Sequence, residues 1–187
     1  IQWDLGVWYI PFAAFVILAT TNSVNLIDGV DGLSSSVTTV VMVTLGLIAL
    51  FMNNAGLDPE ATSVVMVLAL ATAGACMGFL RFNTYPARVF MGDTGSLFMS
   101  GMVIALAFGT GLPFFVVLFG IIYVIEIGSV VLQRCYFKLT HGKRIFKMSP
   151  IHHHFEMSGY TEKQIVVMFA VITAIGSALG ILALRFI

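Results

Sequence analysis

Charged residues are scarce in this sequence. Of its 187 residues only 10% are Asp, Glu, Lys or Arg, whereas 59% are hydrophobic and the mean hydropathy is +1.01. Soluble domains carry about 25% charged residues, so the composition excludes a water-soluble globule and indicates a polytopic membrane protein. Nine basic and nine acidic residues leave no net charge. This balance excludes the basic surface typical of nucleic-acid binding, and we expect no nucleic-acid partner.

Cysteine is also scarce, with only Cys76 and Cys135 in the chain. Neither stands at the spacing of a metal-binding motif, and we expect both to be packing residues without a disulfide bond. The chain begins at Ile1 and lacks the basic stretch and cleavage site of a signal peptide. We therefore expect part of the protein to lie upstream.

Long runs without charge predict the membrane spans. A helix of about 20 residues crosses a bilayer, and the runs that reach this length are 5–27, 32–57, 61–80, 94–125 and 164–184. The fourth run is too long for one span. A Gly- and Pro-containing turn at 109–113 divides it into a helix near 94–110 and a second helix from Pro113 past Glu126 toward Arg134. The sequence thus predicts an all-α fold with six transmembrane helices in a single domain.

The basic residues indicate the orientation. With six crossings, the connections near 28–32, 81–93 and 134–163 share one side of the membrane, and Arg185 lies on the other. Nearly all Lys and Arg residues fall on the first side: Arg81, Arg88, Arg134, Lys138, Lys143, Arg144, Lys147 and Lys163. The positive-inside rule makes this side cytoplasmic. The polar residues of the same connections predict that the functional site lies there too.

The first polar motif is NLIDGVDGL, from Asn25 to Leu33, where Asp28 and Asp31 are each followed by Gly. Asp-Gly pairs are common in plain turns. A calcium loop is disfavoured because the position that needs Glu is Thr39, and the ending of a phosphate-binding P-loop is missing. Two acids next to hydrocarbon are costly unless they are paired or bind a ligand, which favours a binding site.

The second motif is RFNTYPARVFMGDTGSL, in which Gly92, Asp93, Gly95 and Ser96 precede an apolar helix. Asp93 is placed either to cap this helix or to bind Mg²⁺ through a carboxylate oxygen. Exposed amides at a helix N-terminus attract anions such as phosphate. Phe90 is suited to anchoring at the membrane interface or to stacking on a flat base.

The third motif is KMSPIHHHFE. Its three adjacent His residues disfavour a metal site, because successive helical residues point about 100° apart. Solvated interfacial histidines and a role in proton transfer or phosphate contact both remain open. Lys143, Arg144 and Lys147 either attract an anionic substrate or extend toward lipid headgroups.

Glu126 stands inside the fifth predicted span. A charged group there costs about 3 kcal/mol, so this residue needs a partner. It is either protonated or paired with a basic group such as Arg134, about two turns later. Structural and functional roles are both open.

Together, NLIDGVDGL, FNTYPARVFMGDTGS and PIHHHFE resemble the cytoplasmic loops of the polyprenyl-phosphate sugar-1-phosphate transferases. The triple-His form resembles the phospho-N-acetylmuramoyl-pentapeptide transferase (MraY) branch, and the resemblance spans essentially the whole chain. It implies Mg²⁺-dependent transfer of phospho-N-acetylmuramoyl-pentapeptide from its UDP carrier to undecaprenyl phosphate. The products are UMP and lipid I, the first lipid-linked peptidoglycan precursor, made at the cytoplasmic side of the bacterial plasma membrane.

The resemblance also implies roles for individual residues. Asp93 resembles the family's Mg²⁺-binding aspartate, and we take Asp93, His152 and Asp28 as catalytic candidates. The substrate-binding candidates are Asn25, Gly29, Val30, Asp31, Phe90, Gly92, Ser96, His153 and His154. Among these, Phe90 and the Gly29–Asp31 segment resemble the part that receives uracil.

One feature departs from the family. The family has ten crossings and an adjacent aspartate pair in its N-terminal half, and no Asp-Asp pair occurs in this sequence. We therefore expect the chain to be the C-terminal six crossings, to need the N-terminal half as a partner and to be inactive alone. A homodimer is left open, as is transfer of another UDP-sugar. A transporter or channel is the less favoured alternative, because most of the acidic residues that could form an ion path in this chain lie at the ends of the predicted spans.

Overall fold

The computed structural model describes residues 5–184, and in that part of the chain the regular elements are all helical. The long helices are α1 (Tyr9–Leu26), α2 (Leu33–Asn54), α3 (Pro59–Asn83), α4 (Gly92–Gly109), α6 (Ile121–Leu139) and α8 (Glu162–Ala183). The short ones are η1 (Gly6–Trp8), η2 (Pro113–Phe115), α5 (Val116–Phe119) and α7 (Ile151–Glu156). The predicted all-α fold is confirmed. Arg185 lies outside the described residues.

Local sequence signals set the starts of two long helices. Asp58 precedes α3, and its carboxylate accepts a hydrogen bond from the Ala61 N–H at 3.2 Å, with Pro59 in the first turn. Thr161 and Gln164 form a capping box at the start of α8. These caps satisfy backbone N–H groups that the first helical turn leaves without partners.

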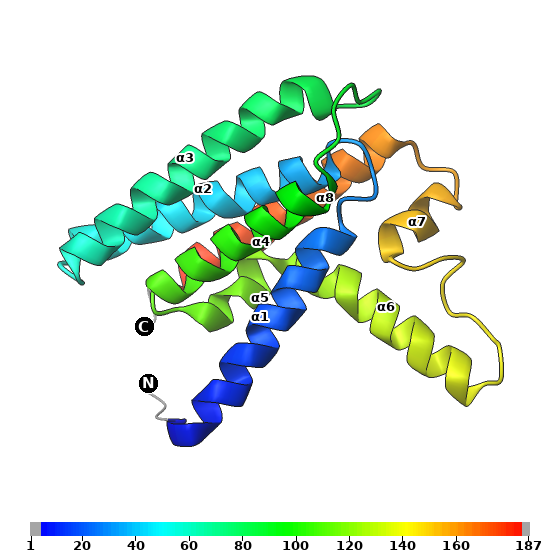
Figure 1. The fold of residues 1–187 in the computed structure, drawn as a ribbon, viewed down its shortest axis with the longest axis horizontal. Helices are drawn as coiled ribbons and strands as arrows, with labels where there is room; N and C mark the ends of the chain where they lie inside the picture. Colours follow the sequence, from blue (N-terminus) through cyan, green and yellow to red (C-terminus); the bar gives the residue numbers. More distant parts are fainter. Residues whose placement is uncertain (1–4, 185–187) are drawn as a thin grey trace.

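The core is built around α2, which packs between α3 and α8 (Figure 1). Leu33, Val37, Val41 and Leu45 on this helix are fully buried. A buried hydrogen bond of 3.0 Å joins the hydroxyl groups of Thr38 and Tyr123, and so ties α2 to α6. In an apolar environment such a bond adds geometric specificity, because leaving either hydroxyl unpaired is costly.

The connections separate onto two ends of the bundle (Figure 1). The α2–α3 turn, the α4–η2 turn and both ends of the described chain lie at one end. The 27–32 loop, the 84–91 loop and α7 lie at the other, so all three polar motifs meet at one end as the sequence predicted.

The fifth crossing is not the continuous helix that we expected from Pro113 toward Arg134. The segment Pro113–Phe119 and α6 meet at an angle of 85°. The chain breaks at Gly120, where a Cβ atom would lie 2.6 Å from the Val116 carbonyl oxygen. Within the described residues, five helices are long and apolar enough to cross a membrane, or six if this bent pair forms one span. Figure 1 shows α6 running outward from the other helices.

Gly176 provides a test of this packing. Its helix α8 passes so close to α5 that a Cβ atom would lie 2.3 Å from the Leu118 carbonyl oxygen. Gly176→Ala should therefore lower the thermal unfolding midpoint of the full-length protein by several degrees, corresponding to about 2 kcal/mol or more. Gly74→Ala is the matched control, because outside the backbone of its own helix no atom lies within 4 Å of the added methyl group, and it should be neutral or stabilising. Equal midpoints for the two variants would contradict the close contact.

Candidate functional site

The last turn of α1 and the first turn of α4 are joined by polar side chains. Asn25 donates from Nδ2 to Asp93 Oδ1 at 3.2 Å and to Ser96 Oγ at 2.9 Å. Ser96 in turn donates to the Asp93 carbonyl oxygen at 3.3 Å. This network fixes the orientation of Asp93, whose side chain remains exposed.

Of the two roles that the sequence left open for Asp93, the structure does not show the helix cap. The helix begins at Gly92, its N-cap residue is Met91, and no side chain accepts a capping hydrogen bond there. Asp93 therefore lies inside the first turn, where a carboxylate still interacts favourably with the helix dipole. Its carboxylate is oriented by Asn25 instead.

Asp28, in the loop after α1, brings a second carboxylate to the same place. Burial, chiefly, and the nearby Asp93 carboxylate raise the pKa of Asp28 from 3.8 to about 6, while a hydrogen bond from the Gly92 backbone opposes the rise. Two carboxylates that face each other in a half-buried site repel when both are ionised. Asp28 and Asp93 are thus close enough to interact electrostatically, and their shared role in a site stays a prediction.

Asp31 has a different surrounding. Its Oδ2 accepts a hydrogen bond from the Ala87 N–H at 2.8 Å, and its own backbone N–H donates to Glu162 at 3.3 Å. Asp31 thereby ties the 27–32 loop to the 84–91 loop and to α8. Phe90 on the 84–91 loop is left 73% exposed.

His152 is fully buried, contrary to the solvated alternative considered for the His motif. Its Nδ1 lies 3.1 Å from both carboxylate oxygens of Glu126, which is also fully buried. A carboxylate only accepts hydrogen bonds, and its two equal distances favour an Nδ1–H donor shared between the oxygens. The expected partner of Glu126, Arg134, is replaced by His152.

The other ring nitrogen of His152, Nε2, faces Gly29 in the 27–32 loop. Nε2 is buried without a hydrogen-bond partner, and a Cβ atom on Gly29 would lie 2.7 Å from it. Only glycine at this position leaves room for the imidazole. Because Gly29 follows Asp28 directly, the 27–32 loop brings the pair of His152 and Glu126 next to Asp28.

The three histidines of α7 point to three different partners. His153 contacts Glu156 through its Nδ1, and His154 Nδ1 accepts a hydrogen bond from the Lys147 backbone N–H at 3.1 Å. They do not converge on one point. Among the described residues, no group of three or more His, Cys, Asp or Glu side chains is arranged to hold a metal.

The predicted site residues therefore differ in what they offer a ligand. Asp28, Asp93 and Phe90 retain exposed surface, whereas the side chains of Val30, Ser96 and His152 are buried. The sequence-based site omitted Glu126. Its isolated charge within an apolar run was the available signal, but the chain spacing did not reveal its partner.

Comparison with known proteins adds a family and a set of relatives. The model of the family described as glycosyl transferase family 4 matches residues 1–111. A phospho-N-acetylmuramoyl-pentapeptide-transferase of Clostridium kluyveri is 50% identical over 97% of this chain and 55% of the relative. One of Clostridium novyi is 50% identical over 97% and 53%, and one of Clostridium perfringens is 51% identical over 93% and 52%. The chain thus spans about half the length of these curated relatives.

The raised pKa of Asp28 predicts a pH-dependent effect of its removal. The pKa is about 6 in the folded protein and 3.8 ordinarily, so the protonated carboxyl of Asp28 favours the fold. This contribution is complete below pH 3.8 and is lost as pH rises through 6, above which the ionised carboxylate destabilises the fold. In metal-free buffer, Asp28→Asn should stabilise the full-length protein at pH 7.5 by on the order of 1 kcal/mol, reduced by solvent screening. Thermal unfolding should show this gain disappearing near pH 4. A variant less stable than wild type at pH 7.5 would contradict the repulsion.

Proposed function

The chain belongs to glycosyl transferase family 4, and on that premise we propose that it supplies the C-terminal part of a phospho-N-acetylmuramoyl-pentapeptide transferase. The complete enzyme transfers phospho-N-acetylmuramoyl-pentapeptide from its UDP carrier to undecaprenyl phosphate and releases UMP. The observation that carries this proposal is the meeting of Asp28, Asp93 and His152 at one end of the helices. A soluble nucleotide sugar and a membrane lipid can react only at such an interface.

The paired carboxylates fit a divalent cation. Asp28 and Asp93 offer hard oxygen ligands, and burial, followed by repulsion from Asp93, raises the pKa of Asp28, which a bound cation would lower. We assign Asp93 as the main Mg²⁺ ligand, with Asp28 beside it. When bound, Mg²⁺ would neutralise charge on the diphosphate and on the UMP leaving group.

Residues of this chain would position the UDP-linked sugar substrate. Asn25 holds one oxygen of Asp93 through a hydrogen bond, so that the other oxygen is directed to the ligand. Backbone N–H groups at the start of α4, near Gly92, attract the phosphates. Exposed Phe90 is placed to stack on the uracil ring, and Asp31 holds the loop that carries Phe90.

His152 is the candidate proton-carrying group beside the 27–32 loop. Glu126 accepts from Nδ1–H and fixes the imidazole so that Nε2 faces the 27–32 loop. A small displacement of Gly29 would expose Nε2 to a phosphate group beside the cation that Asp93 and Asp28 would hold. There Nε2 orients the sugar phosphate or carries a proton, whereas the acceptor phosphate is already anionic and mainly needs positioning.

The rest of the enzyme would complete the site. The relatives are about twice as long as this chain, which supports an N-terminal half as the partner that supplies further catalytic carboxylates. The polar end of the bundle (Figure 1) would face the cytoplasm of a bacterial cell, with the helices in its plasma membrane and a homodimer as a further assembly.

Substitution of Asp93 tests the proposed role in metal binding. Asp93→Asn keeps the size of the side chain and an oxygen that can accept from Asn25, but removes the charge that holds Mg²⁺. In the full-length protein it should lower Mg²⁺-dependent UMP release by about 10³-fold or more with little change in unfolding midpoint. Turnover within threefold of wild type would contradict the assignment.

Substitution of Glu126 tests its role in positioning His152. Glu126→Gln should lower kcat by about 10- to 100-fold, with KM for the UDP-sugar within about twofold, because the imidazole is misoriented while the nucleotide contacts remain. Thr38→Val is the control: it breaks a different buried hydrogen bond to the same helix, and should lower stability without lowering kcat. If both variants affect only stability, Glu126 has no positioning role.

A further inference from the structure

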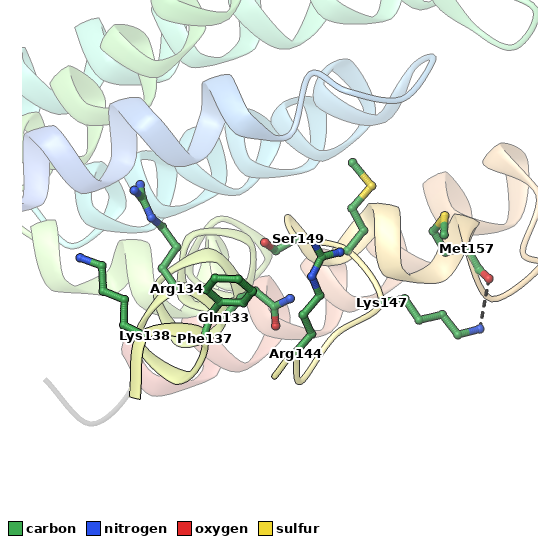
Figure 2. A pocket seen from close by; sticks show the side chains of 9 residues that line it. Gln133, Arg134, Phe137, Lys138, Arg144, Lys147, Ser149 and Met157 are labelled. Atoms are coloured by element: carbon green, nitrogen blue, oxygen red, sulfur yellow. Dashed lines mark hydrogen bonds between the residues drawn. The ribbon is translucent and has the colours of Figure 1, made fainter. Parts of the chain in front are cut away.

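A pocket of about 630 Å³ lies outside the candidate site, between the last turns of α6 and the segment that follows it (Figure 2). Its lining comes from α6, from the loop that follows, and from the end of α7. The residues that line it are Gln133, Arg134, Phe137, Lys138, Arg144, Lys147, Met148, Ser149 and Met157.

The pocket is strongly positive. Arg134, Lys138, Arg144 and Lys147 line it, and no Asp or Glu does. None of the four cations forms an ion pair with a carboxylate of the described residues. Lys147 Nζ donates to the Met157 carbonyl oxygen at 3.1 Å, as Figure 2 shows. Arg134, Lys138 and Arg144 therefore present charge that an anion can neutralise.

The wall of this pocket is held in place by one buried side chain. Gln133 accepts hydrogen bonds from the N–H groups of Ile145 and Phe146, both at 3.0 Å, and donates to the Phe146 carbonyl oxygen at 3.1 Å. These bonds fix the loop that carries Arg144 against α6. The cations from the two segments are thus kept together by the fold.

Apolar surface continues from the pocket. Phe137, Met148 and Met157 contribute to the lining, and α6 exposes Val131, Leu132 and other large hydrophobic residues beside it. A ligand with an anionic head and hydrocarbon chains would satisfy both surfaces. Basic pockets of this kind on the cytoplasmic side of membrane proteins bind anionic lipid headgroups.

The outer end of the pocket is separated from the candidate site along α6. Lys138 follows Glu126 by twelve residues, and a helical rise of 1.5 Å per residue separates them by about 18 Å. The inner end adjoins the His motif, because the Lys147 N–H donates to His154 and Met157 directly follows α7. A headgroup held by Lys138 is therefore far from Glu126, and competition with a polyprenyl phosphate decides whether the reacting lipid enters the pocket.

We propose that this pocket binds the headgroup of an anionic phospholipid of the surrounding bilayer. The phosphate contacts Arg134, Lys138 and Arg144, and the acyl chains lie along the exposed apolar face of α6. The bound lipid holds the outward-running helix at the level of the headgroups. This inference goes beyond the proposed transferase activity and does not depend on it.

Lipid titration of the full-length protein tests the proposal. The protein is purified in non-ionic detergent, stripped of lipid, and titrated with phosphatidylglycerol or phosphatidylcholine, while native mass spectrometry counts the bound lipid. Wild type should prefer phosphatidylglycerol by about tenfold or more. Each cation removed should weaken phosphatidylglycerol binding about fivefold, so Arg134→Gln/Arg144→Gln should lose about 25-fold while its phosphatidylcholine binding stays unchanged.

The control removes two cations outside the pocket, Arg81→Gln/Lys163→Gln, and should change the affinity less than twofold. If the pocket double variant does not fold, the exposed Lys138→Gln alone should still show the fivefold loss. Equal binding of the two lipids, or an equal loss in the control, would overturn the proposal. Displacement of phosphatidylglycerol by 10 mM inorganic phosphate would make the pocket a free-anion site. Displacement by equimolar polyprenyl phosphate would assign it to the reacting lipid, and either result overturns the proposal.

Discussion

The contact between Glu126 and His152 connects the membrane-embedded part of this protein to its polar loops. Both side chains are fully buried, and the imidazole Nδ1 is shared between the two carboxylate oxygens at 3.1 Å. A buried carboxylate is tolerated only when a partner satisfies it. The pair therefore fixes α7 against α6, and it fixes which nitrogen of His152 faces the 27–32 loop.

The break at Gly120 determines where Glu126 lies. In a crossing that continued straight from Pro113, Glu126 would lie on the same axis as η2 and α5. The turn of 85° gives α6 an axis of its own, and Gly176 and Gly120 permit the close backbone approach on which this turn depends. Two glycines outside the site, Gly120 and Gly176, thus help to set the position of the fully buried Glu126.

Much of the fold followed from the sequence, because apolar runs and turn residues act locally. The apolar runs that form the long helices and the meeting of three polar motifs at one end belong to this class. The partner of Glu126 did not follow, since it depends on how α6 is bent, whereas spacing along a single helix suggested Arg134 as one option. Likewise, helix-start statistics cannot reveal that Asn25 on another helix holds Asp93.

The polar residues at this end divide by the direction of their hydrogen bonds. Asp31, Ser96, Gln133 and His154 direct theirs inward, to backbone and side chains that shape the loops. Asp28 and Asp93 repel each other and, among the described residues, form no ion pair with a basic side chain. Burial together with this repulsion raises the pKa of Asp28. A fold that needed these two carboxylates only for stability would pair each with a cation. Their repulsion is instead what a site shows when its ligand carries the compensating positive charge.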